Sequence, residues 1–262
     1  MKTAHYSVAS RSRQSGFTIV EMMVALAISM VVMLGFSVIF VNIKRTFVSQ
    51  DQMSQLQDNE RLAMTMLTTA SNEAGYYPLP ATLLPSQITA DTDSTYGNMA
   101  SAQAISGTSG TSPASDTLSI AFATSANDGL LTCQGHTIVA ADITGAGSAA
   151  GGSVSIRDIF YVDATNKTLN CMVKVNGGTA SSYGGGTGVP LISGVSSMTV
   201  VYGIDGGGGS VVGYYPASGI TGTAPLVWTN VKTARVTLNF VNPNDSTSTI
   251  PWVQTINLLN NN

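Results

Sequence analysis

Hydrophobic side chains dominate residues 17–41, and Glu21 is the only charged residue between Arg13 and Lys44. As an α-helix this segment is about 37 Å long at 1.5 Å per residue, which exceeds the roughly 30 Å hydrocarbon core of a bilayer. The pattern therefore predicts a membrane-spanning helix. A carboxylate inside such a segment is expensive to bury, so Glu21 indicates a function and needs a partner.

Helical periodicity continues beyond the apolar segment, but the residues become more polar. Apolar and small residues then recur at steps of three and four, which places them on one face of a helix. That face consists of Met53, Leu56, Glu60, Ala63, Leu67, Ala70 and Ala74. Gly75, followed by Pro78, predicts the end of the helix. We expect one helix over 17–76, membrane-spanning over 17–41 and amphipathic over 42–76, whose second half packs on the following domain.

Residues 77–262 change to short runs of β-branched and aromatic residues, separated by Gly, Ser, Thr, Asn and Asp. These runs predict a β-rich head domain, and the fold class is therefore α+β. The predicted strands cover residues 117–123, 157–163, 168–175, 196–203, 232–241 and 251–259. The stretch 81–115 is rich in Ser, Thr and Ala with weak periodicity, so we expect a long surface excursion there.

The charges divide the chain at Gly16. Residues 1–16 contain Lys2, Arg11 and Arg13 but no acidic residue. Without these cations the chain has eight Lys and Arg against 14 Asp and Glu, a formal charge of −6. A cleaved secretory signal has its apolar core before the cleavage site, whereas here it follows the polar segment. Charge and hydropathy alone fit a signal anchor that is not cleaved, with its positive charges kept inside.

The residues offer no constellation for catalysis, and we expect no catalytic residue, no cofactor and no metal. His136 is the only histidine after Gly16, and the glycine runs 183–188 and 205–210 lack the Lys-Ser/Thr of a phosphate loop. The "DTDST" stretch (91–95) lacks the glycine and glutamate that close a calcium loop. No Lys or Arg lies between Arg61 and Arg157, which argues against nucleic-acid binding.

The two cysteines, Cys133 and Cys171, each lie in an apparent β run, with no spacing suited to zinc. Two such thiols in an oxidising compartment most often pair, and we favour a disulfide over two independent buried thiols.

One short motif gives the apolar segment a specific interpretation. The sequence "GFTIVEMMVAL" (16–26) resembles the processing site of type IV prepilins, the subunits of type IV pili and of type II secretion pseudopili. This resemblance implies that Gly16 ends a leader of residues 1–16 and that an inner-membrane prepilin peptidase cuts after it. It also implies N-methylation of Phe17 by the same enzyme. Glu21 is then the fifth mature residue, which is thought to meet the N-terminal amine of a neighbouring subunit during assembly.

Two further stretches resemble the PilW-type minor pilins. These are "QLQDNERLAMTMLTTASNEAGYYP" (55–78) and the region from "PLISGVSSMTVVYGIDGGGG" to "VWTNVKTARVTLNF" (190–240). The resemblance implies a structural role in pilus assembly, with other minor pilins, the major pilin and the prepilin peptidase as partners. It places the helix in the bacterial inner membrane, the head in the periplasm and the assembled subunit in the pilus. A minor pseudopilin of type II secretion and a pilus-tip adhesin are the alternatives.

Overall fold

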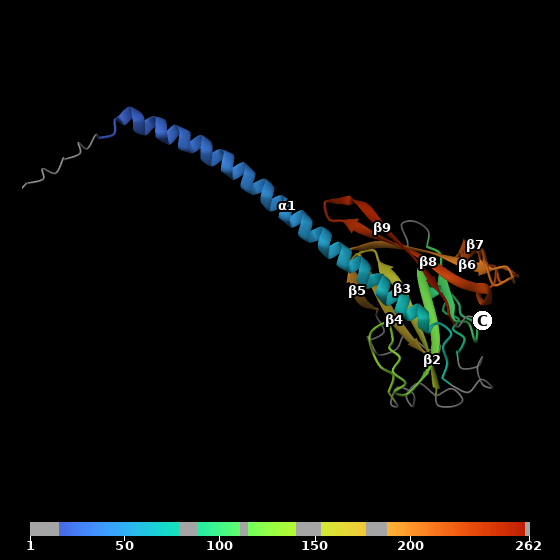
Figure 1. The fold of residues 1–262 in the computed structure, drawn as a ribbon. Helices are drawn as coiled ribbons and strands as arrows, with labels where there is room; N and C mark the ends of the chain where they lie inside the picture. The colour runs from blue at the N-terminus through green and yellow to red at the C-terminus, as the bar shows by residue number, and fades with distance from the viewer. Residues whose placement is uncertain (1–15, 79–87, 111–114, 140–152, 177–187, 260–262) are drawn as a thin grey trace, which may run out of the picture. The chain divides into compact units, whose positions relative to one another are not determined.

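The computed structural model describes residues 16–78, 88–110, 115–139, 153–176 and 188–259. They form two units, the first ending at Asp51 and the second beginning at Gln52. The helix α1 (Ile19–Glu73) contributes to both units. It is followed by nine strands in the described part of the chain, β1 to β9, which all lie in the second unit (Figure 1). This is the α+β architecture that the sequence predicts.

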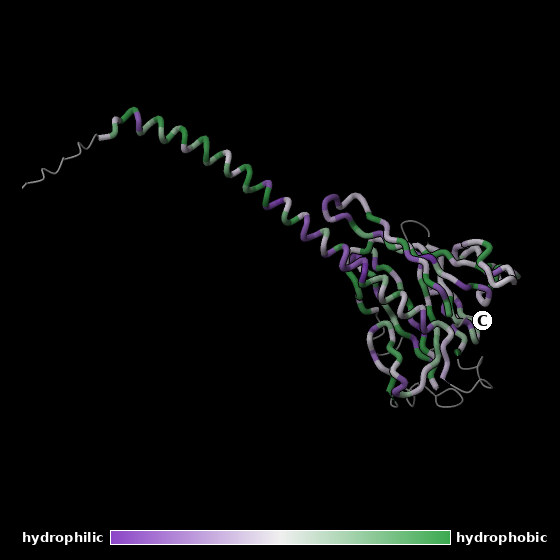
Figure 2. The backbone as a smooth tube through the Cα atoms, viewed as in Figure 1, coloured by the Kyte–Doolittle hydropathy of each residue, from purple (hydrophilic) through white to green (hydrophobic). Residues whose placement is uncertain are grey.

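The first half of α1 has no covered face. Its side chains from Ile19 to Phe47 are exposed, and Figure 2 shows that most of this stretch is hydrophobic. The most apolar window has a mean hydropathy of 2.7, and none of it is buried inside the protein. By length and composition this is a helix that can cross a membrane.

The second half of α1 packs on the head through the stripe that the periodicity predicts. Leu56, Glu60, Ala63, Leu67, Ala70 and Ala74 are all buried, and Met53 is partly buried against the same core. α1 ends at Glu73, and Gly75 follows with a φ of 73°, a left-handed conformation that glycine adopts without strain. The predicted packing and the predicted stop are both confirmed.

The strands form two antiparallel sheets (Figure 1). The first has the order β1-β2-β3-β4-β5 and consists of β1 (Ile105–Thr108), β2 (Thr117–Ser125), β3 (Ser153–Asp163), β4 (Thr168–Val175) and β5 (Val189–Ser193). The second has the order β7-β6-β8-β9 and consists of β6 (Val195–Asp205), β7 (Val211–Pro216), β8 (Val231–Asn242) and β9 (Asp245–Asn257). The chain passes from one sheet to the other at Gly194, whose φ is 85°.

One hydrophobic core joins the second half of α1 to both sheets. On β8, Ala234, Val236, Leu238 and Phe240 are buried in it, while the residues between them are more exposed. This is the alternation that the sequence predicts for a strand with one wet face. Strands β2, β3 and β4 are instead buried almost throughout, because the first sheet is also covered on its other face, where Ile88, Met99, Ala121 and Ala123 form a smaller cluster.

All six predicted strands are present, although β9 begins six residues before the predicted start at Pro251. Three strands were missed: β1, β5 and β7. The predicted surface excursion over 81–115 is wrong for its described part, because Ile88, Met99 and Ile105 are at most 2% exposed. These apolar residues stand singly among Ser, Thr and Gly, so they give no periodic signal although they cover the face of a sheet.

Candidate functional site

The predicted assembly residues lie at the start of α1. The Thr18 hydroxyl accepts the backbone N–H of Glu21 at 3.3 Å, and the Thr18 carbonyl accepts the N–H of Met22 at 3.2 Å. Thr18 is therefore the N-cap of the helix, a role that sequence reasoning missed although threonine is a preferred capping residue. Glu21 lies in the first turn, where a negative charge is favourable.

Nothing in the described chain covers this end of the helix. Phe17 is 84% exposed and Ile19 is 82% exposed, and a Cβ added at Gly16 would meet no atom within 4 Å. Among the described residues, no cation pairs with the Glu21 carboxylate. The structure therefore brings Gly16, Phe17 and Glu21 together only as neighbours along the chain, and any partner of Glu21 is supplied from outside this part of the protein.

The predicted disulfide between Cys133 and Cys171 is present, with a Cα–Cα distance of 6.2 Å. Cys171 lies on β4 and is fully buried. Cys133 does not lie in a strand, contrary to the prediction. It occupies a turn that closes when the Thr132 carbonyl accepts the N–H of Gly135 at 2.7 Å. Gly135 adopts a φ of 75°, and this glycine was the signal for a turn.

Two carboxylates with raised pKa values lie close to the disulfide. Asp158 is fully buried, and its Oδ2 accepts the N–H of Cys133 at 2.8 Å, whereas its Oδ1 has no partner. Burial, and then the charge of Glu73, raise the pKa of Asp158 well above its ordinary value. Burial, and then the charge of Asp128, raise the pKa of Glu73 to about 7. Both carboxylates therefore bind a proton more tightly in the folded head than in the unfolded chain.

The two carboxylates of the "DTDST" stretch are already neutralised by the chain itself. Arg157 pairs with Asp91, and the Lys174 ammonium lies 3.1 Å from Asp91 and 2.7 Å from Asp93. The hydrogen bond from Lys174 is the main cause that lowers the pKa of Asp93 to about 2. Arg157 and Lys174 are register partners on β3 and β4. This network holds the segment around Asp91 on the first sheet. The two carboxylates, whose spacing resembles that of a calcium loop, therefore have a structural role here.

The second glycine run also binds its own carboxylate. Asp205 Oδ1 accepts the N–H groups of Gly207, Gly208 and Gly209 at 2.8, 3.1 and 3.0 Å. The donors that a phosphate would need are therefore occupied in this loop. Most of the first run, 183–188, lies outside the described residues.

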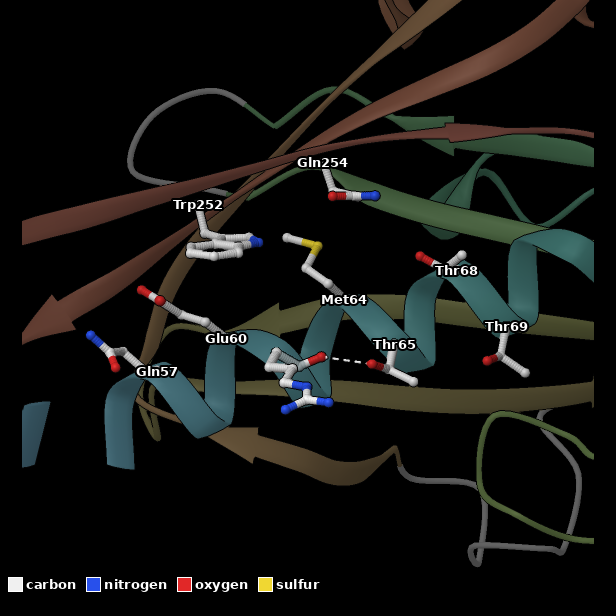
Figure 3. Close-up of a pocket in the computed structure, with 9 residues that line it drawn as sticks. Gln57, Glu60, Met64, Thr65, Thr68, Thr69, Trp252 and Gln254 are labelled. Carbon is white, nitrogen blue, oxygen red and sulfur yellow. Dashed lines mark hydrogen bonds between the residues drawn. The ribbon is translucent and has the colours of Figure 1, made fainter. Parts of the chain in front are cut away.

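A groove of about 680 Å³ lies in the head between α1 and β9. Its lining consists of Gln57, Glu60, Arg61, Met64, Thr65, Thr68 and Thr69 from α1 with Trp252 and Gln254 from β9. Figure 3 shows the side chains of Glu60 and Met64 extending from α1 toward Trp252. Sequence reasoning placed Glu60 on the packing face of the helix but missed the groove. The signal was the carboxylate itself, which stands in a stripe of otherwise apolar and small residues.

Two family models match the chain, at different places. The prokaryotic N-terminal methylation motif matches residues 11–37, which contain Gly16, Phe17 and Glu21. The type IV pilus-assembly protein W family matches residues 159–259, which extend from β3 to the residues after β9. No curated protein and no solved structure matches the chain.

The two matches agree with the two units of the structure. A methylation motif on an exposed apolar helix indicates anchoring in the inner membrane before assembly, and the second match covers most of the strands of the head. Both families are structural rather than enzymatic. Together, the matches show that the chain resembles the PilW-type minor pilins over much of its head and carries a prepilin-type N-terminus, and they support anchoring in the inner membrane and a part in type IV pilus assembly.

Proposed function

We propose that this chain is a non-enzymatic subunit that is processed after Gly16 and enters the pilus by docking through Glu21. In this proposal residues 1–16 are a leader, and residues 17–41 are first a membrane anchor and then an assembly segment. Residues 42–76 carry the head, 77–262, on the periplasmic side. The observation that supports the proposal is the position of Glu21, the one carboxylate in an uncovered apolar helix and one turn after the expected cut.

The chemistry of the docking step follows from that position. Cleavage after Gly16 creates a free amine on Phe17, four residues before Glu21, which is about one turn at 3.6 residues per turn. A lone carboxylate or amine in an apolar bundle is strongly unfavourable, whereas a pair of them is much less so. If the Glu21 carboxylate of one subunit meets the Phe17 amine of its neighbour, only the correct axial stagger neutralises both groups.

In this proposal, other molecules pack on the exposed apolar surface of the helix. Residues 17–41 have no cover in the described chain, so lipid covers them in the membrane and neighbouring pilin helices cover them in a filament. We propose the major pilin and the other minor pilins as those neighbours. The prepilin peptidase and methyltransferase is the partner at the earlier step, when the leader is removed and Phe17 is methylated.

The position of the cut is tested with Gly16→Trp in the host that carries the pilus system. We expect the wild-type protein, purified from membranes, to begin at N-methylated Phe17 by mass spectrometry. Gly16→Trp should keep its leader, because a bulky side chain blocks the approach of the peptidase to the backbone. Gly35→Trp is the matched control, since Gly35 also has open space around it and should be processed normally. Normal processing of Gly16→Trp, or a different first residue, would contradict the proposal.

A further inference from the structure

The second sheet ends at β9, an edge strand beside the groove. Among the described strands β9 pairs only with β8, so its other edge has no strand partner there and keeps backbone groups for pairing on either side of Pro251, which has no N–H to donate. It is 13 residues long, far longer than the short edge strands with which proteins avoid unwanted pairing. Asp245, at its first position, is its only charged residue. An extended segment of another chain could therefore add to this edge as one more strand.

The groove lies where the side chains of such a strand would point. Leu238 pairs with Trp252, and Val236 pairs with Gln254, so both groove residues of β9 face the side on which β8 is buried. Trp252 is nevertheless 40% exposed. The sheet therefore ends before it covers α1, and one more strand on β9 would bring every second side chain over the uncovered helix.

The groove also specifies the charge of its occupant. Glu60 is only 4% exposed, its Oε1 has no hydrogen-bond partner, and no described cation pairs with it. Burial raises the pKa of this carboxyl group. The neighbouring Arg61 lines the same groove without pairing with Glu60. Since a buried, unpaired carboxylate is destabilising, the site is completed by a cationic donor.

From the free edge of β9, the groove and the unpaired Glu60, we infer that the head docks an extended segment of a different protein, which pairs with β9 and places a Lys or Arg side chain on Glu60. Its side chains two residues away lie over Met64 and Trp252 and are therefore apolar or small. This inference concerns the head alone and goes beyond the docking role of Glu21.

A second copy of the chain does not offer this chemistry in its described strands. Arg157 and Lys174 are buried in the ion network, and the Arg235 guanidinium lies 4.1 Å from the ring centre of Tyr214. Lys232, the remaining cation on a strand, is also engaged. The occupant is therefore a different protein, and the charge of Glu60 selects it.

The inference is tested by photo-cross-linking in cells of the pilus-bearing host. The photoreactive residue p-benzoylphenylalanine replaces Gln254 in the full chain, and the cross-linked peptide is identified by mass spectrometry. We expect a segment of another protein with a Lys or Arg within three residues of the linked position. Glu60→Gln should lower the cross-link yield by about tenfold or more, because loss of one partner of a buried charge pair strongly weakens binding.

Two controls separate binding from folding. Asp58→Asn makes the same change of charge on an exposed residue of α1 outside the groove, and should leave the yield unchanged. Glu60→Gln should keep or raise the protease resistance of the head, since it removes an uncompensated buried charge. Reversal of the pair, Glu60→Lys with the identified cation changed to Glu, should restore the cross-link.

Four results would each overturn the inference: no cross-link, a cross-link only to a second copy or to lipid, a linked segment without a cation, or a yield unaffected by Glu60→Gln. None of these results tests the proposed role of Glu21, because Glu21 lies in the first half of α1, whereas Glu60 and the groove lie in the second half.

Discussion

The two halves of α1 differ in what their apolar residues contact. Leu34, in the first half, is 65% exposed, whereas Leu67, in the second half, is fully buried in the core of the head. The helix is continuous, so the difference comes from the arrangement of the apolar residues. A helix with one apolar stripe can bury that stripe against a single protein surface, whereas a helix that is apolar all round needs an apolar environment on every side.

In each half, the carboxylate that we assign to docking has no partner in the described chain. Glu21 stands in the apolar first half, and Glu60 faces the groove in the second half. A protein that only had to fold would gain stability from an apolar residue at position 60. Both carboxylates are therefore best explained by contacts with other molecules, and the following predictions test the separation of the two halves.

The largest difference is expected between the same substitution, Leu to Ala, made in the second half of α1 and in the first half. Leu67→Ala should lower the free energy of unfolding of the head by about 3 to 5 kcal/mol, because it leaves a cavity in a closed core. Leu34→Ala removes the same atoms from an exposed position and should leave the stability of the head unchanged. Urea unfolding of the full chain in detergent micelles, followed by limited proteolysis of the head, measures both. A similar loss in the two variants would mean that the halves are not energetically separate.

The disulfide should matter nearly as much, and only to the head. The bond joins cysteines 38 residues apart, and closing a loop of that size contributes about 3 to 4 kcal/mol in the chain-entropy model. The double variant Cys133→Ser, Cys171→Ser should unfold at a correspondingly lower urea concentration, while its insertion into the membrane stays normal. Insertion is measured by carbonate extraction. An unaltered unfolding midpoint would contradict the stabilising role of the bond.

A smaller effect is expected from Glu73. Its pKa rises from 4.5 in the unfolded chain to about 7 in the folded head, so the folded state binds this proton more tightly. The free energy of unfolding should therefore fall as the pH rises from 4.5 to about 7, by about 1 to 2 kcal/mol after allowance for solvent screening. The raised pKa of Asp158 acts in the same direction. Glu73→Gln should flatten this dependence, and unfolding curves at pH 5 and pH 7.5 would show whether it does.

The features that could be predicted from the sequence are those in which one pattern of apolar and polar residues repeats along the chain. The apolar segment, the stripe from Met53 to Ala74 and the alternation on β8 are of this kind, and all three are confirmed. The disulfide could also be predicted, because Cys133 and Cys171 are the only two cysteines of the chain.

The missed features depend on residues far apart in the sequence. The ion network joins Asp91 to Arg157 and Lys174 across 66 and 83 residues, and the groove joins α1 to β9. No local pattern reports such contacts. The strands β1 and β5 are short, and β7 is half-exposed and interrupted by Gly213, so their periodicity is weak.

The central claim is that Glu21 acts in assembly and not in folding or membrane insertion. It is tested most directly by competition in one cell between a wild-type and a Glu21→Ala copy with different epitope tags. The ratio of the two copies is measured by quantitative mass spectrometry in the inner membrane and in sheared filaments, and the protease resistance of both heads is compared. We expect equal amounts in the membrane, equally resistant heads, and strong depletion of Glu21→Ala from the filaments. An equal ratio in filaments and membrane would contradict the account.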